Sequence, residues 1–226
     1  IYENSIYEAI KVPLGSCDDV CFNVDMIAKL LEISNDMDVI VIGPGLGRRS
    51  ETIAFIRKFI EVCHNKCKFV IDADALYAFS DNVKLLSDVI SHKDVVITPH
   101  DGEFCRLFNK TIPIDNRLYS VNYFSQLIKG NILLKGAYTI ISSYNGSYTI
   151  KGTGNSGMAT GGSGDVLTGI IAGISASNHL NMYDSACIGA FIHGLSGDIS
   201  AELYGEISMT AYDLIENLPL AFKKVM

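Results

Sequence analysis

The sequence has 226 residues, enough for one sizeable α/β domain, and no linker-like stretch divides it. Hydrophobic residues make up 48% and charged residues 19%, which is typical of a globular protein with a well-buried core. A formal net charge of −7, with no basic arm, argues against a nucleic-acid partner. No apolar run is long enough to cross a bilayer, so no membrane partner is expected. The six cysteines form no CxxC pair, and we expect reduced thiols in a cytoplasmic protein.

Taken in chain order, the sequence alternates helical patterns with short strands that are apolar on both faces. The helical patterns cover residues 22–33, 52–63, 116–129, 165–176, 183–203 and 210–218. The strand patterns cover residues 38–43, 68–72, 94–98, 132–135, 139–142 and 147–150, and Asn145-Gly146 predicts a hairpin between the last two. We therefore expect a single α/β domain over residues 1–226, with a mostly parallel central sheet covered by helices on both faces.

Polar or glycine-rich segments follow the strands of this pattern. These segments are 44–47 (PGLG), 72–74 (DAD), 98–103 (TPHDGE), 135–139 (KGAYT) and 161–165 (GGSGD). In an open parallel sheet, ligands bind outside the carboxyl ends of the strands. The segments should therefore line one crevice at a single edge of the sheet.

The GGSGD segment predicts a phosphate site. Gly161, Gly162 and Gly164 leave backbone N–H groups uncovered at the start of a helix, where the helix dipole adds partial positive charge. Such a turn binds anions, and phosphate is the usual anion. Asp165 follows directly, where its carboxylate could accept a proton from a nucleophile that attacks phosphorus. The alternative is that Asp165 only caps the helix, but capping needs fewer glycines than this.

Two other glycine motifs fit this sequence poorly. Residues 152–157 (GTGNSG) match the dinucleotide fingerprint GxGxxG, but the predicted helix starts later and no acid lies at the ribose distance. A Walker A loop requires Lys-Ser or Lys-Thr after its glycines, and neither pair is present. We therefore expect this protein to contain neither a functional dinucleotide fingerprint nor a Walker A loop.

Further candidate residues lie in the other segments. Gly45 and Gly47 would let the backbone approach a ligand closely, or would form a plain strand–helix turn. Asp72 and Asp74 would share one face of an extended strand, where they could hold Mg²⁺ through water or cap the next turn. Lys135 could place a positive charge near a nucleotide or simply lie in a turn.

Histidine and acidic residues complete the set of candidates. His100 could donate a hydrogen bond to a substrate and Glu103 could orient metal-bound water, or the two could belong to an ordinary capped helix start. His193 lies in an apolar helical pattern and is expected to be a core or interface histidine. Asp198 and Asp213 are expected to be helix-surface or capping acids.

With these segments together, the sequence resembles the ADP/ATP-dependent NAD(P)H-hydrate dehydratases of the ribokinase-like superfamily. The matching stretches are VIGPGLG (41–47), IDADAL (71–76), TPHDGE (98–103), LLKGAYT (133–139), GNSGMATGGSGDVLTGIIAG (154–173) and HGLSGD (193–198). The resemblance implies a three-layer ribokinase-like domain that repairs NADH or NADPH whose nicotinamide ring has been hydrated. ATP or ADP, with Mg²⁺, would phosphorylate the ring hydroxyl, and phosphate would then leave to restore the double bond.

The resemblance also assigns roles to residues. Asp165 would be the base that acts on the ring hydroxyl. The nucleotide would contact Lys135, Gly136, Ala137, Tyr138, Thr139, Gly161, Gly162, Ser163 and Gly164. The hydrated cofactor would contact Gly45, Gly47, His100 and Asp165, and Glu103 would hold the metal through water. Family members commonly form homo-oligomers, which the apolar pattern at residues 183–203 allows.

The sequence departs from the family pattern at its beginning. It starts at Ile1 rather than Met, and nothing in it resembles the N-terminal glycine-rich strand–turn–helix of the family. Either the chain is truncated at its N-terminus, which we expect, or its sheet is short of strands. The runner-up function is a small-molecule kinase of the same superfamily, such as a vitamin-precursor kinase, with the same role for Asp165. A third is a nucleotide-binding module that truncation has left inactive.

Overall fold

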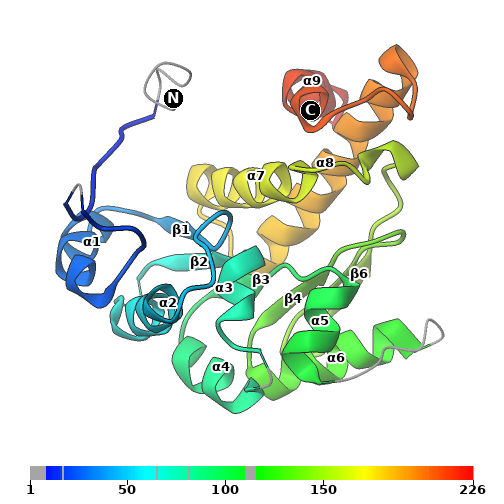
Figure 1. The fold of residues 1–226 in the computed structure, drawn as a ribbon. Coiled ribbons are helices and arrows are strands. Elements are labelled where there is room, and N and C mark those ends of the chain that lie inside the picture. Colours follow the sequence, from blue (N-terminus) through cyan, green and yellow to red (C-terminus); the bar gives the residue numbers. More distant parts are fainter. Residues whose placement is uncertain (1–8, 17, 65, 81, 110–115, 226) are drawn as a thin grey trace.

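The computed structural model describes residues 9–16, 18–64, 66–80, 82–109 and 116–225. Within them, the strands form one sheet in the order of the sequence (Figure 1). They are β1 (Val39–Ile42), β2 (Lys68–Ile71), β3 (Val95–Ile97), β4 (Asn131–Leu134), β5 (Ile140–Ser142) and β6 (Tyr148–Ile150). The pairs from β1 to β4 are parallel, whereas β4–β5 and β5–β6 are antiparallel. The predicted mostly parallel sheet is confirmed.

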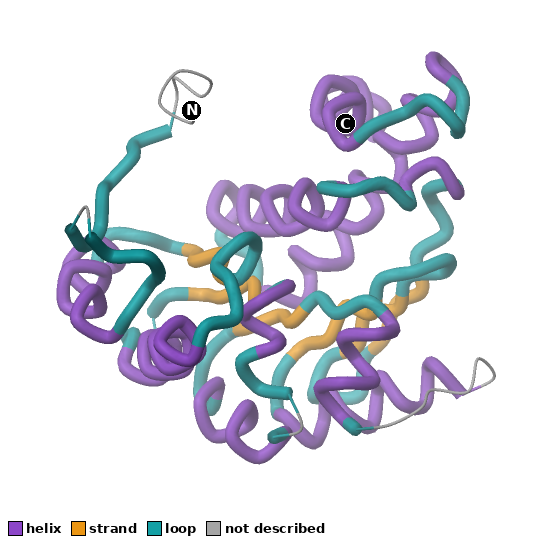
Figure 2. The backbone as a smooth tube through the Cα atoms, viewed as in Figure 1, coloured by secondary structure: helices purple, strands orange, loops and turns teal. Residues whose placement is uncertain are grey.

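Helices cover both faces of this sheet (Figure 2). They are α1 (Ile27–Ser34), α2 (Ser50–Val62), α3 (Ala73–Tyr77), α4 (Val83–Ile90), α5 (Asp101–Phe108), α6 (Arg117–Ile128), α7 (Ser163–Asn178), α8 (Met182–Tyr204) and α9 (Ala211–Val225), with short 3-10 turns η2 (Val24–Met26) and η4 (Ser156–Met158). None of the described helices combines the length and the hydropathy that a membrane span requires.

The structure corrects the predicted elements in two respects. Helices α3 and α4 were not predicted, whereas α5 confirms the capped helix start that was the alternative for His100 and Glu103; α3 and α5 begin within the DAD and TPHDGE segments. Helix α9 was expected to end at Leu218, but it continues through Pro219 to Val225. The missing N–H of Pro219 leaves the carbonyl of Ile215 without its helical donor, at a residue that is 48% exposed.

Alternation along the strands divides the core into two layers. Phe69 and Ile71 of β2 pack with the helices α2 to α6, whereas Val70 between them packs with α7 and α8 on the opposite face. The same alternation continues along β3 (Val95, Val96, Ile97) and β4 (Ile132, Leu133, Leu134). Successive strand residues point to opposite faces, so strands covered on both sides must be apolar throughout.

Helix α9 lies outside α7 and α8 and forms a third apolar cluster with them (Figure 1). Close approach of α7 and α8 depends on Gly189, which faces Ile171. A Cβ atom on Gly189 would lie 2.7 Å from Ile171 Cγ1 and 3.3 Å from Ile171 Cα. Because a contact with Cα cannot be relieved by a rotamer change, α8 can lie this close only with glycine at that position.

The substitution Gly189→Ala is therefore expected to destabilise the fold by about 1–3 kcal/mol, the usual effect of overpacking a core. Its matched control is Gly173→Ala in α7, where a Cβ atom would meet no described atom within 4 Å. Alanine favours a helix interior over glycine, so the control should be neutral or more stable by up to about 1 kcal/mol. Urea unfolding of both variants measures the difference; equal changes for the two would contradict the packing argument.

Candidate active site

The segments predicted to line one crevice meet at one edge of the sheet. Strands β1 to β4 are parallel, so their carboxyl ends lie on the same side. The closest approach brings the start of α7 against the ends of β2 and β4. A Cβ atom on Gly164 would lie 3.4 Å from Lys135 Nζ and 3.8 Å from Asp72 Oδ2. The GGSGD, DAD and KGAYT segments thus form one site.

Helix α7 begins without a side-chain cap. Its N-cap is Gly162, whose φ of 87° lies in the left-handed region that glycine adopts without strain. Asp165 is exposed and belongs to the first turn of α7, so the alternative prediction that it caps the helix is wrong. A Cβ atom on Gly161 would meet no described atom within 4 Å. An anion can therefore reach the first-turn N–H groups of α7.

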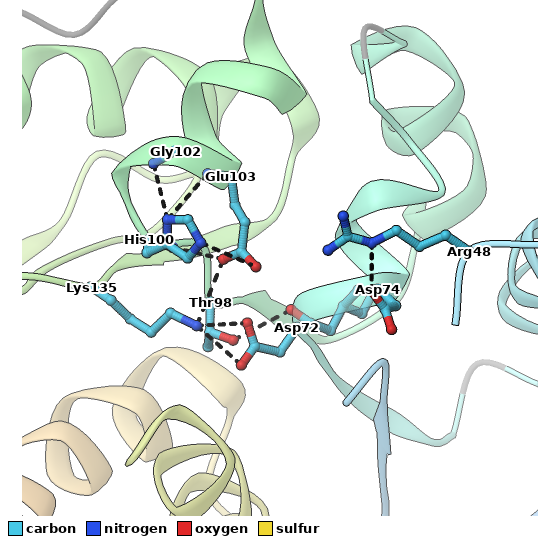
Figure 3. A network of polar contacts seen from close by, with 9 residues as sticks. Arg48, Asp72, Asp74, Thr98, His100, Gly102, Glu103 and Lys135 are labelled. Atoms are coloured by element: carbon cyan, nitrogen blue, oxygen red, sulfur yellow. Dashed lines mark hydrogen bonds and ion pairs between the residues drawn. The ribbon is translucent and has the colours of Figure 1, made fainter. Parts of the chain in front are cut away.

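Lys135 and Asp72 form a buried ion pair beside the start of α7 (Figure 3). Lys135 Nζ lies 2.8 Å from Asp72 Oδ1 and 3.1 Å from Oδ2, and the Asp72 side chain is only 2% exposed. Glu103 Oε2 lies 3.8 Å from the same ammonium group. Burial raises the pKa of Asp72 above its ordinary value, and the charge of Lys135 opposes that rise. The pair fixes a cation next to the partial positive charge of the helix.

His100 is the N-cap of α5 and forms a capping box with Glu103. Its Nδ1 accepts hydrogen bonds from the N–H groups of Gly102, at 3.0 Å, and Glu103, at 3.4 Å. Glu103 Oε2 in turn accepts the His100 N–H at 2.9 Å. Because Nδ1 accepts, the neutral ring carries its proton on Nε2. Its Nε2 lies 3.6 Å from Glu103 Oε1, beyond hydrogen-bonding distance, and the side chain is 58% exposed, so His100 caps the helix and can still donate its Nε2–H to a ligand.

Asp72 and Asp74 do not share a face, so the prediction of a carboxylate pair is wrong. Strand β2 ends at Ile71, and the chain turns at once into α3. Asp74 Oδ1 accepts a hydrogen bond from Arg48 Nε at 2.7 Å, and Oδ2 accepts one from the Gly47 N–H at 2.9 Å. Figure 3 shows Asp72 and Asp74 turned toward Lys135 and Arg48, respectively. Asp74 therefore fixes the loop after β1 rather than completing a metal site with Asp72.

Arg117, which sequence analysis missed, holds the KGAYT segment in place. Its Nη2 donates to the carbonyl of Lys135 at 3.2 Å, and its Nη1 donates to that of Ala137 at 3.4 Å. Asp101 Oδ1 lies 3.0 Å from Arg117 Nη2 and anchors the guanidinium. Arg117 begins α6, outside every motif, and a basic residue at that place carries no signal in a single sequence.

The other predicted site residues lie along the same edge of the sheet. Gly45 is exposed with a φ of 71°, and Gly136 has a φ of 144°, so both adopt conformations that favour glycine. Tyr138 is exposed, and Thr139 is buried with its hydroxyl donating to the Gly136 carbonyl at 3.1 Å. These residues shape a turn whose backbone groups and tyrosine ring can face a ligand.

A side chain of α8, Asp198, holds the loop between β6 and α7 in place. Asp198 Oδ2 accepts the Gly154 N–H at 2.9 Å, and Oδ1 accepts from Asn155 Nδ2 at 3.1 Å. Asp198 was expected to be a surface or capping acid, and the contact with this loop corrects that expectation. Asp213 does cap its helix, because it accepts the Thr210 N–H at 2.7 Å. Residues 152–157 form part of this loop and lead into a 3-10 turn, not into the helix that a dinucleotide fingerprint requires.

His193 of α8 is buried directly behind the start of α7, as a core histidine was predicted to be. Its Nε2 lies 3.3 Å from the hydroxyl of Ser163, the first residue of α7. Burial, and then the positive charge of Lys151, lower the pKa of His193 from 6.5 to about 4. The ring is therefore neutral at physiological pH and supports the first turn of α7 without adding charge.

Glu103 is the residue through which a metal ion was predicted to bind. No group of three or more His, Cys, Asp and Glu side chains in the described part of the chain could hold a metal ion by itself. Mg²⁺ is commonly bound by one or two carboxylates together with substrate phosphates. Glu103 has a side chain that is 11% exposed and lies 3.8 Å from Lys135, so its carboxylate fits such a shared site beside a phosphate-bearing ligand.

An apolar groove of about 560 Å³ extends from the loop after β1 to α7. Leu46 and Ile42 line it on the β1 side, and Asp165 and Thr168 line it on the α7 side. Asp165 therefore has the start of α7 on one side and apolar surface on the other. A carboxylate at such a boundary can act on a group carried by a largely apolar ring.

Comparison with known sequences agrees with this geometry. The profile of a family described as NAD(P)H-hydrate dehydratase matches residues 4–220. The bifunctional NAD(P)H-hydrate repair enzyme Nnr of Moorella thermoacetica is 38% identical over 203 residues, which cover 89% of this chain and 37% of that relative. The chain thus spans well under half the length of this relative.

Solved structures give the same fold. Bacillus subtilis YxkO matches with a TM-score of 0.74 and 25% identity, over 89% of this chain and 73% of that chain. The ADP/ATP-dependent NAD(P)H-hydrate dehydratase of B. subtilis, co-crystallised with ATP and Mg²⁺ and soaked with CoA, matches with a TM-score of 0.73 and 24% identity, over 89% and 72% of the two chains. A ribokinase-like superfamily protein of Enterococcus faecalis matches with a TM-score of 0.71 and 28% identity, over 88% of this chain and 68% of that chain, so the predicted ribokinase-like fold is confirmed.

The buried His193 predicts a specific dependence of stability on pH. Its pKa is lowered in the folded state, so the unfolded chain binds the proton more readily between pH 6.5 and about 4. The resulting stability is complete above pH 6.5 and falls as the pH drops toward 4, by on the order of 3 kcal/mol. His193→Gln, which keeps a polar group beside Ser163, should lose this part of the pH dependence.

Urea unfolding of wild type and His193→Gln across this pH range measures the difference in slope. His179→Asn is the matched control, because His179 is exposed at the end of α7 and asparagine tolerates its left-handed backbone. The control should follow wild type at every pH. Parallel curves for wild type and His193→Gln would contradict a neutral buried histidine.

Proposed function

The chain belongs to the NAD(P)H-hydrate dehydratase family, and from that premise we propose that it dehydrates hydrated NADH and NADPH with ATP or ADP as phosphoryl donor. The observation that carries the proposal is the uncapped start of α7, with Asp165 in its first turn and Lys135 beside Gly164. This arrangement suits phosphoryl transfer, in which catalysis is mostly positioning and electrostatic stabilisation. The identity of the phosphoryl acceptor, the hydroxyl group of the hydrated nicotinamide ring, is proposed from family membership.

In this proposal the nucleotide phosphates bind at the start of α7. The first-turn N–H groups donate to the terminal phosphoryl group, and the helix dipole adds to their effect. Lys135, fixed by Asp72, supplies a positive charge. Its attraction for the oxygens of the transferring phosphoryl group grows as negative charge spreads over them. The KGAYT turn held by Arg117 would contact the rest of the nucleotide through Gly136, Ala137, Tyr138 and Thr139.

Asp165 is the proposed general base. Its carboxylate takes the proton of the ring hydroxyl as that oxygen attacks the terminal phosphorus, and the bond from phosphorus to the nucleotide breaks. In the second step the ring C–O bond breaks and its electron pair leaves with phosphate. Loss of a proton from the adjacent ring carbon supplies the electrons of the new double bond. The products are NADH or NADPH, inorganic phosphate and the shortened nucleotide.

Glu103 and His100 have supporting roles in this proposal. Glu103 would hold Mg²⁺, through water and together with the phosphates, and the ion would neutralise charge on the nucleotide. His100 offers its Nε2–H to a polar group of the hydrated ring, and Gly45 and Gly47 let the ring approach the loop after β1. The family resemblance also favours one domain that acts in the cytoplasm as a homo-oligomer.

A coupled assay tests the reaction class. Given hydrated NADH, Mg²⁺ and either ATP or ADP, the protein should regenerate the absorbance of NADH and release one phosphate for each NADH formed. A small-molecule kinase would instead accumulate a stable phosphorylated product without any return of NADH. No reaction with either donor, combined with measurable nucleotide binding, would leave only a nucleotide-binding module.

Asp165→Asn should remove the chemistry while it leaves nucleotide binding in place. Loss of a general base typically lowers turnover by about 10²- to 10⁴-fold, whereas loss of one negative charge near a polyphosphate should not weaken its binding. Asp184→Asn is the matched control, since Asp184 also lies in the first turn of a helix, α8. Turnover and nucleotide affinity measured on both variants decide the point; near-normal turnover of Asp165→Asn would end the assignment.

A further inference from the structure

Arg48 is fixed at the β1 end of the crevice by two contacts, one with Asp74 and one with Tyr77. Its Nε donates to Asp74 Oδ1 at 2.7 Å, and its guanidinium lies over the ring of Tyr77, 4.7 Å from the ring centroid. Asp74 also accepts the Gly47 N–H, so the arginine and its loop share one anchor. Yet the Arg48 side chain is 50% exposed, and a solvent-exposed ion pair contributes little to stability.

The contacts leave most of the donors of Arg48 free. A guanidinium carries five N–H donors, and among the described residues only the one on Nε has an acceptor. Figure 3 shows the terminal nitrogens directed toward the side of the crevice where His100 and Glu103 lie. Arg106 approaches the same tyrosine ring, with its guanidinium carbon 5.9 Å from the centroid, and adds a second positive charge nearby. A planar fork of free donors is the arrangement that binds phosphate.

This site is separate from the anion site at the start of α7. Figure 3 shows His100, Glu103 and Lys135 together on one side of the view and Arg48 with Asp74 on the other. The nucleotide phosphates occupy the Lys135 side in the proposed reaction. The second anionic reactant is the dinucleotide, which carries a diphosphate bridge and, in the NADPH form, a 2′-phosphate.

We propose that Arg48, held by Asp74 and Tyr77, binds a phosphate group of the dinucleotide substrate. The inference rests on the proposed function and adds a specificity-determining residue to it. A ring bound between Asp165 and His100 is covalently tethered to its phosphates, so a fixed cation beside that ring can hold the whole substrate in register. In the proposed reaction the nucleotide donor binds at the start of α7, so its binding should not depend on Arg48.

The test compares Arg48→Gln with Arg49→Gln. Arg49 is the neighbouring residue, is exposed and loses the same charge, but it makes no contact with Asp74 or Tyr77. One charge-assisted hydrogen bond corresponds to roughly a tenfold to hundredfold change in affinity. Arg48→Gln should therefore raise KM for hydrated NADPH, which carries both candidate phosphates, about tenfold or more, with kcat and the KM for ATP within about twofold of wild type. Arg48→Lys should recover part of the loss, because it restores the charge without the fork.

The two substrates identify which phosphate is bound. An equal rise in KM for hydrated NADH and hydrated NADPH assigns Arg48 to the diphosphate bridge, and a rise confined to the NADPH form assigns it to the 2′-phosphate. Unchanged melting temperature and ATP kinetics show that the variant is folded. An active wild type with equal kinetics for Arg48→Gln and Arg49→Gln would overturn this inference alone, whereas an inactive wild type would remove the proposed function on which it rests.

Discussion

The ion pair between Lys135 and Asp72 is the interaction on which the site depends. It joins the ends of β2 and β4 and places an ammonium group against Gly164 at the start of α7. A buried ion pair is a poor way to stabilise a fold, because removing two charges from water offsets most of their attraction. Two apolar side chains would hold the strands together as well. The pair instead provides a positive charge of fixed position. It lies at the edge of the sheet where α7 begins, and the N-terminus of that helix carries partial positive charge as well.

Around this pair, the groups that face a ligand are largely main-chain N–H and carbonyl groups. Charged side chains hold the loops that carry them in place. Asp198 holds the loop before α7, Arg117 holds the turn after β4, and Asp74 holds the loop after β1. Each of these side chains bonds to a main-chain N–H or carbonyl group. A catalytic site built from backbone amides needs such support, because an amide can point only where its loop is fixed.

Much of the fold was predictable from the sequence, because strands buried on both faces must be apolar throughout. The pattern around Val70 and Val96 therefore identified β2 and β3, and glycines next to an apolar helix identified the start of α7. The supporting contacts were not predictable. Lys135 and Asp72 are 63 residues apart, and only the finished sheet brings them together.

The carboxylates Asp72 and Asp74 show a second limit of the sequence. Their spacing suggested a pair on one face, because a strand was assumed to continue past Ile71. The chain turns into the short helix α3 instead, so the two acids serve different partners. A helix of five residues leaves too little periodicity to recognise from one sequence.

The position of β1 at the end of the strand order affects how easily each side of the crevice opens locally. This strand pairs only with β2 in the described sheet and, apart from the buried Ile42, its residues are partly or fully exposed, whereas β3 is paired on both sides and completely buried. Local opening requires the least free energy where few neighbours and little apolar burial hold the chain. The wall that carries Gly47 and Arg48 should therefore open and exchange its amide hydrogens more readily than the wall that carries Lys135. A ligand that contacts Arg48 should therefore slow amide exchange in the β1 wall more than a ligand that contacts only the start of α7.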